Sequence, residues 1–170
     1  MTLKNNISKK ALKDDLDKII RSHVLASVGT GMIPLPIVDL AGLMGIQLNM
    51  IKKIAEVYSV PFFEEAAEKT LMSLVSYILM KNFGVVAISA IKAIPIVGQA
   101  IGSIAMPTFC GASTYASGKM FMLHFDSGGT FYSFDEEKVK NHYASLYKDG
   151  KKMASEIKKD IKPIKNQDEN

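Results

Sequence analysis

Two long blocks of this sequence are nearly free of charged residues, one from Val24 to Ile51 and the other from Thr70 to Gly118. The segments before, between and after these blocks carry nearly all of the other ionisable groups. This arrangement indicates an apolar middle that either contacts lipid or forms the core of a bundle wrapped by charged helices. The charged residues inside the two blocks are Asp39, Lys81 and Lys92.

The spacing of apolar residues predicts helices along most of the chain. From Leu12 to Val24 they recur on one helical face, with Lys and Asp residues opposite, so the N-terminal segment is predicted to be an amphipathic helix capped by Ser8. Further helices are expected over about residues 37–58, 61–91 and 97–125. Residues 126–130 are expected to form a turn, and Asp135 to cap a last amphipathic helix.

Proline residues interrupt both charge-poor blocks. Pro34 and Pro36 lie in the first block and Pro95 in the second. Because proline lacks a backbone N–H and restricts the residue before it, a helix stops or turns sharply at each site. The predicted fold class is therefore all-α: a helical bundle built from two Pro-broken apolar helical hairpins, flanked by amphipathic N- and C-terminal helices.

The chain of 170 residues is long enough for one domain and too short for two well-packed ones. Apolar residues make up 48% and charged residues 22%, which excludes a disordered chain. Within the one domain we predict an amphipathic N-terminal helix over residues 1–23 and an apolar double-hairpin core over 24–125. A turn, an amphipathic helix and a polar tail follow over 126–170.

The sequence leaves open whether the apolar blocks cross a membrane. Residues 97–118 are uncharged and long enough to span a bilayer but are rich in Gly, Ser and Thr. Residues 70–93 carry Lys81 near their centre, and a central Lys raises the free energy of membrane insertion by about 2.5–3.5 kcal/mol. If each hairpin enters and returns, both termini and the charged segments lie on the cytoplasmic side of the cytoplasmic membrane. The alternative is a soluble cytoplasmic bundle that hides the same residues in its core.

The charge pattern argues against nucleic acid as a partner. The formal net charge is +4, but only one of the 21 Lys and Arg residues is Arg, and acidic residues interleave with the lysines. A Lys-rich surface beside apolar helices suits the anionic cytoplasmic face of a lipid bilayer, or is an ordinary solvated surface. The single cysteine, Cys110, forms no internal disulfide.

No group of residues has the spacing of a catalytic, cofactor-binding or metal site. The three His residues share no metal-ligand spacing with Cys or carboxylates, and none lies beside a nucleophile with a partner base. The Gly-rich turn at residues 126–130 lacks the Gly-Lys-Ser/Thr ending of a phosphate-binding loop. We therefore expect no cofactor and no enzymatic activity.

Six residues are instead candidates for structural or interaction roles. Asp39 is expected either in the first turn of the helix that Pro36 opens, where unpaired N–H groups stabilise a carboxylate, or paired with a buried Lys81 or Lys92. The small-xxx-small spacing of Gly98 and Gly102 lets helices approach closely, within one hairpin or between two copies of the chain. The candidates are Pro34, Pro36, Asp39, Pro95, Gly98 and Gly102.

An ordered series of motifs resembles the bacterial family called domain of unknown function 697. The resemblance implies an all-helical, membrane-associated module, often attached to or encoded near a small-GTPase-like domain, with no established catalytic residues. Because this chain has no guanine-nucleotide motif, a GTPase partner would be encoded separately. The motifs, which span about Arg21–Lys152, are Gly31–Asp39, Gln47–Ala55, Ile94–Gly98, Thr114–Lys119 and Gly128–Phe131.

Two functions from different classes fit these observations. The first is a non-catalytic, membrane-associated helical protein that anchors or recruits a cytoplasmic partner, such as a GTPase. The alternative is a soluble helical interaction or oligomerisation module with no membrane contact. A small enzyme or channel that uses Asp39 ranks third. The expected partners are the cytoplasmic face of a lipid bilayer, a separately encoded GTPase and a second copy of the chain.

The two roles of Asp39 predict different stability losses. We expect Asp39→Asn to lower the free energy of unfolding by about 0.3–1 kcal/mol, because a first-turn amide keeps much of the hydrogen bonding. A buried pair with Lys81 or Lys92 would instead cost about 3–5 kcal/mol. Urea unfolding of the single and double variants separates the two roles, and strong non-additivity would contradict the first-turn role.

Overall fold

The computed structural model describes residues 2–32, 36–93 and 95–161, with side chains placed for residues 10–32, 41–82, 84 and 106–161. These ranges form five α-helices and one short 3-10 helix with no strand, which confirms the predicted all-α fold. The elements are α1 (Thr2–Thr30), α2 (Pro36–Val57), α3 (Glu64–Ala93), α4 (Pro95–Asp126), η1 (Phe131–Ser133) and α5 (Glu136–Ile161).

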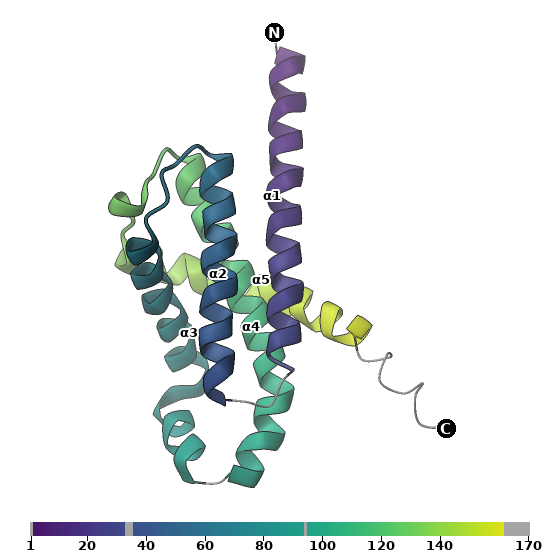
Figure 1. Ribbon diagram of the computed structural model, residues 1–170, viewed down its shortest axis with the longest axis vertical. Coiled ribbons are helices and arrows are strands. Elements are labelled where there is room, and N and C mark those ends of the chain that lie inside the picture. Colours follow the sequence, from purple (N-terminus) through teal and green to yellow (C-terminus); the bar gives the residue numbers. More distant parts are fainter. Residues whose placement is uncertain (1, 33–35, 94, 162–170) are drawn as a thin grey trace.

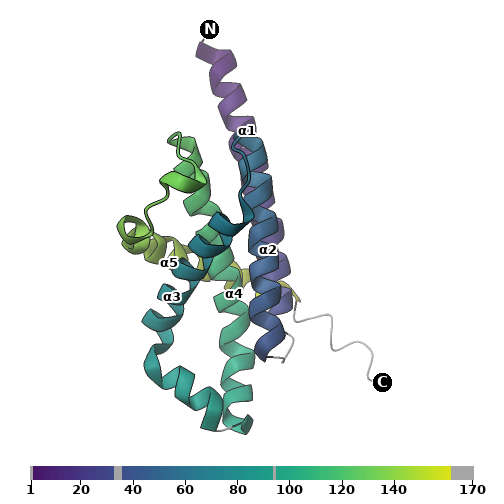
Figure 2. The ribbon, with the colours of Figure 1, turned by 60° about the vertical axis from the view of Figure 1, so that its left-hand side comes forward.

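The first four helices run alternately up and down, and α5 crosses them (Figure 1). α4 contacts every other α-helix and is the central element of the fold. Figure 2 shows that the last part of α3 and the first part of α4 extend beyond the start of α2. The first turns of α1 project from the opposite end of the bundle (Figure 1).

The core contains the apolar helix faces that the sequence spacing indicates. Leu16, Ile20 and Val24 on α1 are buried, as predicted, and the same face continues to Val28. This spacing of four residues keeps the side chains on one face of a helix. They pack with α2 and the end of α4, while a second group of buried side chains lies between α3, α4 and α5. The second group includes Leu74, Ile78, Phe109, Met120, Tyr143 and Tyr147.

Glycines allow α4 to lie unusually close to its neighbours. A Cβ atom on Gly111 would lie 2.6 Å from the Val28 side chain of α1 and 2.8 Å from that of Ala154 on α5. A Cβ atom on Gly150 of α5 would lie 2.8 Å from the Ala112 carbonyl oxygen. All three distances are shorter than van der Waals contact, so any larger residue at either position requires the helices to move apart.

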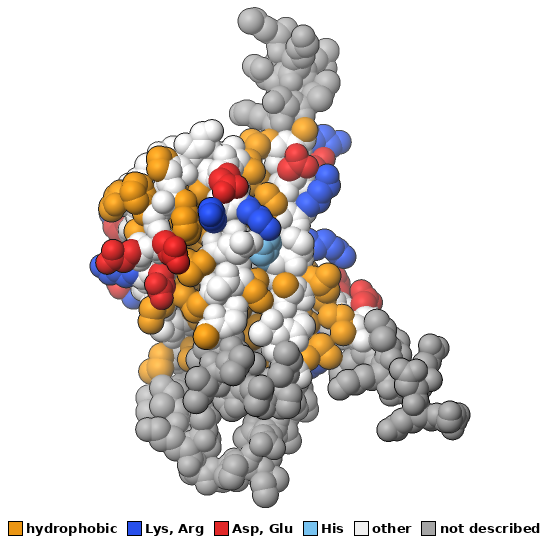
Figure 3. Space-filling view, in the orientation of Figure 1, with side chains coloured by type: hydrophobic (Ala, Val, Ile, Leu, Met, Phe, Trp, Pro, Cys, Tyr) orange, Lys and Arg blue, Asp and Glu red, His pale blue; other side chains and the backbone are white. Residues whose placement is uncertain are grey.

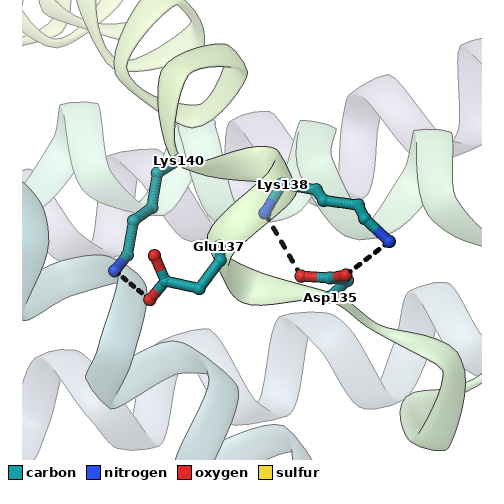
Figure 4. A network of polar contacts seen from close by, with 4 residues as sticks. All are labelled: Asp135, Glu137, Lys138 and Lys140. Atoms are coloured by element: carbon teal, nitrogen blue, oxygen red, sulfur yellow. Dashed lines mark hydrogen bonds and ion pairs between the residues drawn. The ribbon is translucent and has the colours of Figure 1, made fainter.

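The start of α5 follows the sequence prediction. The backbone N–H of Lys138 donates to Asp135 Oδ1 at 3.2 Å, which makes Asp135 the capping residue (Figure 4). The Lys138 ammonium lies 2.8 Å from Asp135 Oδ2, and this hydrogen bond lowers the pKa of the Asp135 carboxyl below its usual value. Two residues further on, Lys140 pairs with Glu137 (Figure 4).

The ends of the first helix differ from the prediction. α1 begins at Thr2, so Ser8 lies inside the helix and is not its cap. α1 ends at Thr30 and α2 begins at Pro36, whereas Pro34 lies outside the described residues. The tight turns that Pro34, Pro36 and Pro95 are expected to mark stay a prediction.

α3 contains a break that the apolar pattern does not reveal. Gly84 has φ 62° and ψ −174°, a backbone conformation that other residues rarely adopt, and the helix changes direction there. Among the described residues, no side chain or neighbouring backbone crowds the position of a Cβ at Gly84, and the positive φ itself favours glycine here.

A matched pair of Gly→Ala substitutions tests the close approach of α4 and α5. Gly150→Ala is expected to lower the free energy of unfolding by about 1–3 kcal/mol, because its methyl group meets the Ala112 backbone. Gly45→Ala on α2 has open space around it and should raise stability by about 0.5–1 kcal/mol. Urea unfolding followed by circular dichroism measures both, and equal stability of the two variants would contradict the packing argument.

Candidate functional site: a charge-poor half and a buried polar network

The fold gathers the charge-poor stretches of four helices into one half of the bundle. α1 and α3 run toward the end where α4 begins, and α2 and α4 run away from it (Figure 1). The stretches therefore lie side by side, and the ionisable groups of these helices gather toward the opposite end. We call the first region the charge-poor half; it consists of residues 24–30, 36–51, 70–93 and 95–118.

Side-chain exposure agrees with this division on the face shown in Figure 3. The charged side chains visible there lie in its upper and middle parts, and hydrophobic side chains reach the lowest described residues. Met72 and Met80 on α3 are 55% and 46% exposed, although they belong to the charge-poor half. No described helix combines the length and the apolar character needed to cross a membrane.

The structure describes only part of the neighbourhood of the predicted site residues. Pro36 and Pro95 are the first residues of α2 and α4, and Gly98 and Gly102 lie in α4. Pro34 and the side chains of Pro36, Asp39 and Pro95 lie outside the described residues, as do the surroundings of the two glycines. Lys81, a predicted partner of Asp39, is exposed and donates a hydrogen bond to the Tyr77 hydroxyl at 3.1 Å.

A network of buried hydroxyl and amide groups joins α1, α2, α4 and α5. Ser27 and Thr114 share a hydrogen bond of 2.7 Å between α1 and α4. Gln47 of α2 donates through Nε2 to Ser113 Oγ and Thr114 Oγ1, both at 3.3 Å. The six side chains of this network are all 0% exposed: Ser27, Gln47, Ser113, Thr114, Ser117 and Tyr143.

The remaining bonds satisfy the other polar groups of the network. Ser117 donates to Gln47 Oε1 at 3.1 Å, and its hydroxyl lies 3.0 Å from the Tyr143 hydroxyl of α5. Tyr143 also donates to the Ser113 carbonyl at 3.3 Å, while the Ser113 hydroxyl donates to the Cys110 carbonyl at 3.1 Å. Each side chain thus has at least one partner, as buried polar groups require.

Burial keeps the network neutral. Desolvation raises the pKa of Tyr143 well above its usual value, an effect that the hydrogen bond with Ser117 reduces but does not cancel. Desolvation also raises the pKa of the neighbouring Tyr147 to about 12. The network therefore holds hydrogen-bond donors and acceptors with no ionised side chain, an arrangement that fixes helix positions.

Two of the three His residues, His23 and His124, form contacts that hold segments together. His23 is buried, with Nδ1 2.6 Å from the Ile19 carbonyl and Nε2 3.0 Å from Asn49 Oδ1 of α2. His124 Nε2 lies 2.9 Å from the Thr130 carbonyl in the turn after α4. Among the described residues, no group of three or more His, Cys, Asp or Glu side chains is placed to hold a metal ion.

One feature of the sequence indicates this network, although the spacing of apolar residues does not reveal it. Residues 111–118 of α4 are almost all small, and Ser and Thr recur within an otherwise apolar helix. Gln47 and Thr114 occur in motifs that carry the family resemblance, but the resemblance assigns them no role. Partners such as Ser27 and Thr114 are 87 residues apart, so only the folded arrangement brings them together.

Comparison with known proteins places the chain among its relatives. The family model for a domain of unknown function, DUF697, matches residues 2–152. Magnetosome membrane protein 22 of Magnetospirillum gryphiswaldense is 33% identical over 143 residues, which cover 84% of this chain and 73% of that protein. No solved structure matches the chain.

Removal of one hydroxyl tests the energetic role of the network. Tyr143→Phe is expected to lower the free energy of unfolding by about 1–3 kcal/mol, because the Ser113 carbonyl loses its Tyr143 donor and Ser117 loses a partner. Tyr132→Phe removes the same atom from a side chain that is 75% exposed and should change stability by less than about 0.5 kcal/mol. Similar losses in both variants, measured by urea unfolding, would rule out a stabilising network.

Proposed function

The chain belongs to the DUF697 family, and we propose that it is a non-catalytic, membrane-associated protein that anchors a cytoplasmic partner. The observation that carries the proposal is the collection of four charge-poor helix stretches into one half of an antiparallel bundle. In the proposed arrangement this half contacts lipid. The opposite end of the bundle, where the ionisable groups of α1 to α4 gather, is called the charged half; it stays in water on the cytoplasmic side with both termini.

The energetics of lipid contact favour this orientation. A charged residue near the bilayer centre costs about 2.5–3.5 kcal/mol, so the charged half, with its many Lys, Asp and Glu residues, is excluded from lipid. The charge-poor half holds only Asp39, Lys81 and Lys92. Where α3 and α4 extend beyond α2, the part of the chain from Gly84 to the start of α4 reaches lipid first in this orientation.

The proposal includes the Pro-broken hairpins. Pro36, two residues after Pro34 in the sequence, and Pro95 begin α2 and α4, and each of these helices runs opposite to the helix before it. We assign each site to the turn of a hairpin that enters the apolar part of the membrane and returns to the same side, buried partly against the other hairpin. Irregular backbone is tolerated at membrane depth when protein covers it.

The related magnetosome protein supports the location. Its name describes a membrane protein, and its 33% identity extends over most of both chains. The cytoplasmic partner is assigned from the family resemblance, which points to a separately encoded GTPase that binds the charged half. A homo-oligomer is compatible with the same arrangement.

A second candidate function is a soluble interaction module whose charge-poor half is covered by a second copy. The exposure of Met72 and Met80 on α3 favours it, because large exposed apolar side chains are common at protein interfaces. The two functions differ in what covers these methionines: lipid in the first and protein in the second.

Exposed apolar residues in the two halves provide a matched test of lipid contact. Met80→Glu places a charge in the charge-poor half and should lower the fraction of full-length protein that floats with phospholipid vesicles several-fold. Leu123→Glu makes a similar change on α4 in the charged half, where the side chain is 43% exposed, and should leave flotation unchanged.

The same preparation distinguishes the two functions. Native membranes that keep the protein after carbonate washing support the membrane-associated protein. A stable oligomer without detergent, no flotation with vesicles, and dissociation by Met80→Glu would overturn that proposal in favour of the soluble module.

A further inference from the structure

A groove lies where the last turns of α5 pass beside α1. Its volume is about 390 Å³, and its apolar wall is formed by Leu25, Ile157 and Ile161. Leu25 is 50% exposed and Ile161 is partly exposed, so these two side chains form the open part of the wall, whereas Ile157 is 6% exposed and lies beneath them. Lys18, Arg21 and Asp160 form the polar part of the lining.

Arg21 is the only arginine of the chain, and within the part of the chain that the structure describes its guanidinium makes no hydrogen bond or ion pair. Two of the three acidic residues before it on α1 are already paired: Asp15 with Lys18 at 3.2 Å and Asp17 with Lys119 at 2.5 Å. A guanidinium presents several N–H donors in a planar fork that matches a phosphate group. Arg21 is therefore available to bind an anion from outside the chain.

The groove lies at the boundary between the two halves on α1. Charged residues of this helix end at Arg21, one turn before the exposed Leu25, and the charge-poor stretch begins at Val24. A molecule that places a phosphate at Arg21 and an apolar chain along Leu25, Ile157 and Ile161 matches this order of polar and apolar groups.

Asp160 places a second chemical requirement on a molecule that binds in the groove. Its carboxylate lines the same groove and, like Arg21, makes no ion pair with any described residue. A ligand that carries only negative charge would be repelled by this carboxylate. A head group with a phosphate and a primary ammonium complements both residues, because the ammonium N–H groups donate to Asp160 while the phosphate accepts from Arg21.

From these features we infer that the groove between α1 and α5 binds a phospholipid whose head group is phosphoethanolamine. Arg21 holds the phosphate, Asp160 accepts from the ammonium, and Leu25 with the two isoleucines of α5 contacts the first part of an acyl chain. The inference rests on the proposed membrane association and names the lipid chemistry that the protein prefers.

Flotation of full-length protein with two kinds of vesicle tests the inference. Phosphatidylethanolamine and phosphatidylcholine with the same acyl chains have equal net charge, but only the first has ammonium N–H donors. We expect a several-fold preference of the wild-type protein for vesicles that contain phosphatidylethanolamine. Asp160→Asn should abolish this preference, whereas Asp149→Asn, an exposed acid elsewhere on α5, should keep it.

The phosphate contact is tested separately. Arg21→Gln should weaken binding to both kinds of vesicle by about five- to tenfold, and Arg21→Lys, which keeps the charge but loses the fork, should fall between the wild type and Arg21→Gln. Lys52→Gln removes an exposed positive charge from α2, outside the groove, and should change binding less than twofold.

The outcomes separate this inference from the proposed function. If the wild-type protein binds neither kind of vesicle, the membrane proposal fails, and this inference with it. If it binds both but the Arg21 and Asp160 variants bind like the wild type, only the groove assignment is wrong. A preference for phosphatidylethanolamine that persists in Asp160→Asn would reflect lipid packing and would overturn the head-group contact. Release from vesicles by millimolar inorganic phosphate would assign Arg21 to free phosphate instead.

Discussion

The fold depends on how closely α4 approaches α1 and α5. Gly111 and Gly150 make this approach possible because a side chain at either position would overlap the neighbouring helix. The short distance has a second effect, since the hydroxyls of Ser and Thr reach partners only across closely spaced helices. The hydrogen bond between Ser27 and Thr114, at 2.7 Å, therefore depends on the same glycines as the apolar packing around it.

Because successive helices run in opposite directions, the charge-poor blocks of the sequence become one charge-poor end of the folded bundle. Each charge-poor block spans the connection between two helices, so both connections, near Pro34 and Pro95, fall at the same end of the bundle. Charged residues at the outer ends of the blocks are brought together at the other end for the same reason. No pairing of individual charges is needed to produce the two halves.

Much of the architecture was predictable from local patterns. The faces of the helices follow apolar spacing, and Asp135 caps α5 as a capping residue should. The break at Gly84 was not predictable, because the apolar residues continue through it and only the backbone dihedral angle distinguishes it. The polar network was missed for a different reason: Gln47 and Ser117 are 70 residues apart, and no local pattern records which distant hydroxyl faces an amide.

The position of Tyr143 in the network has a consequence for the order of folding. Until α5 docks, Ser117 lacks its tyrosine partner. An intermediate that has assembled α1, α2 and α4 without α5 therefore leaves the α4 backbone at Gly111 uncovered by Ala154, and the Ser113 carbonyl and Ser117 hydroxyl without Tyr143. The intermediate lacks both the packing of α5 and the Tyr143 hydrogen bonds, and each loss raises its free energy. Docking of α5 and closure of the interior should therefore occur as one cooperative step with little population of partly folded forms.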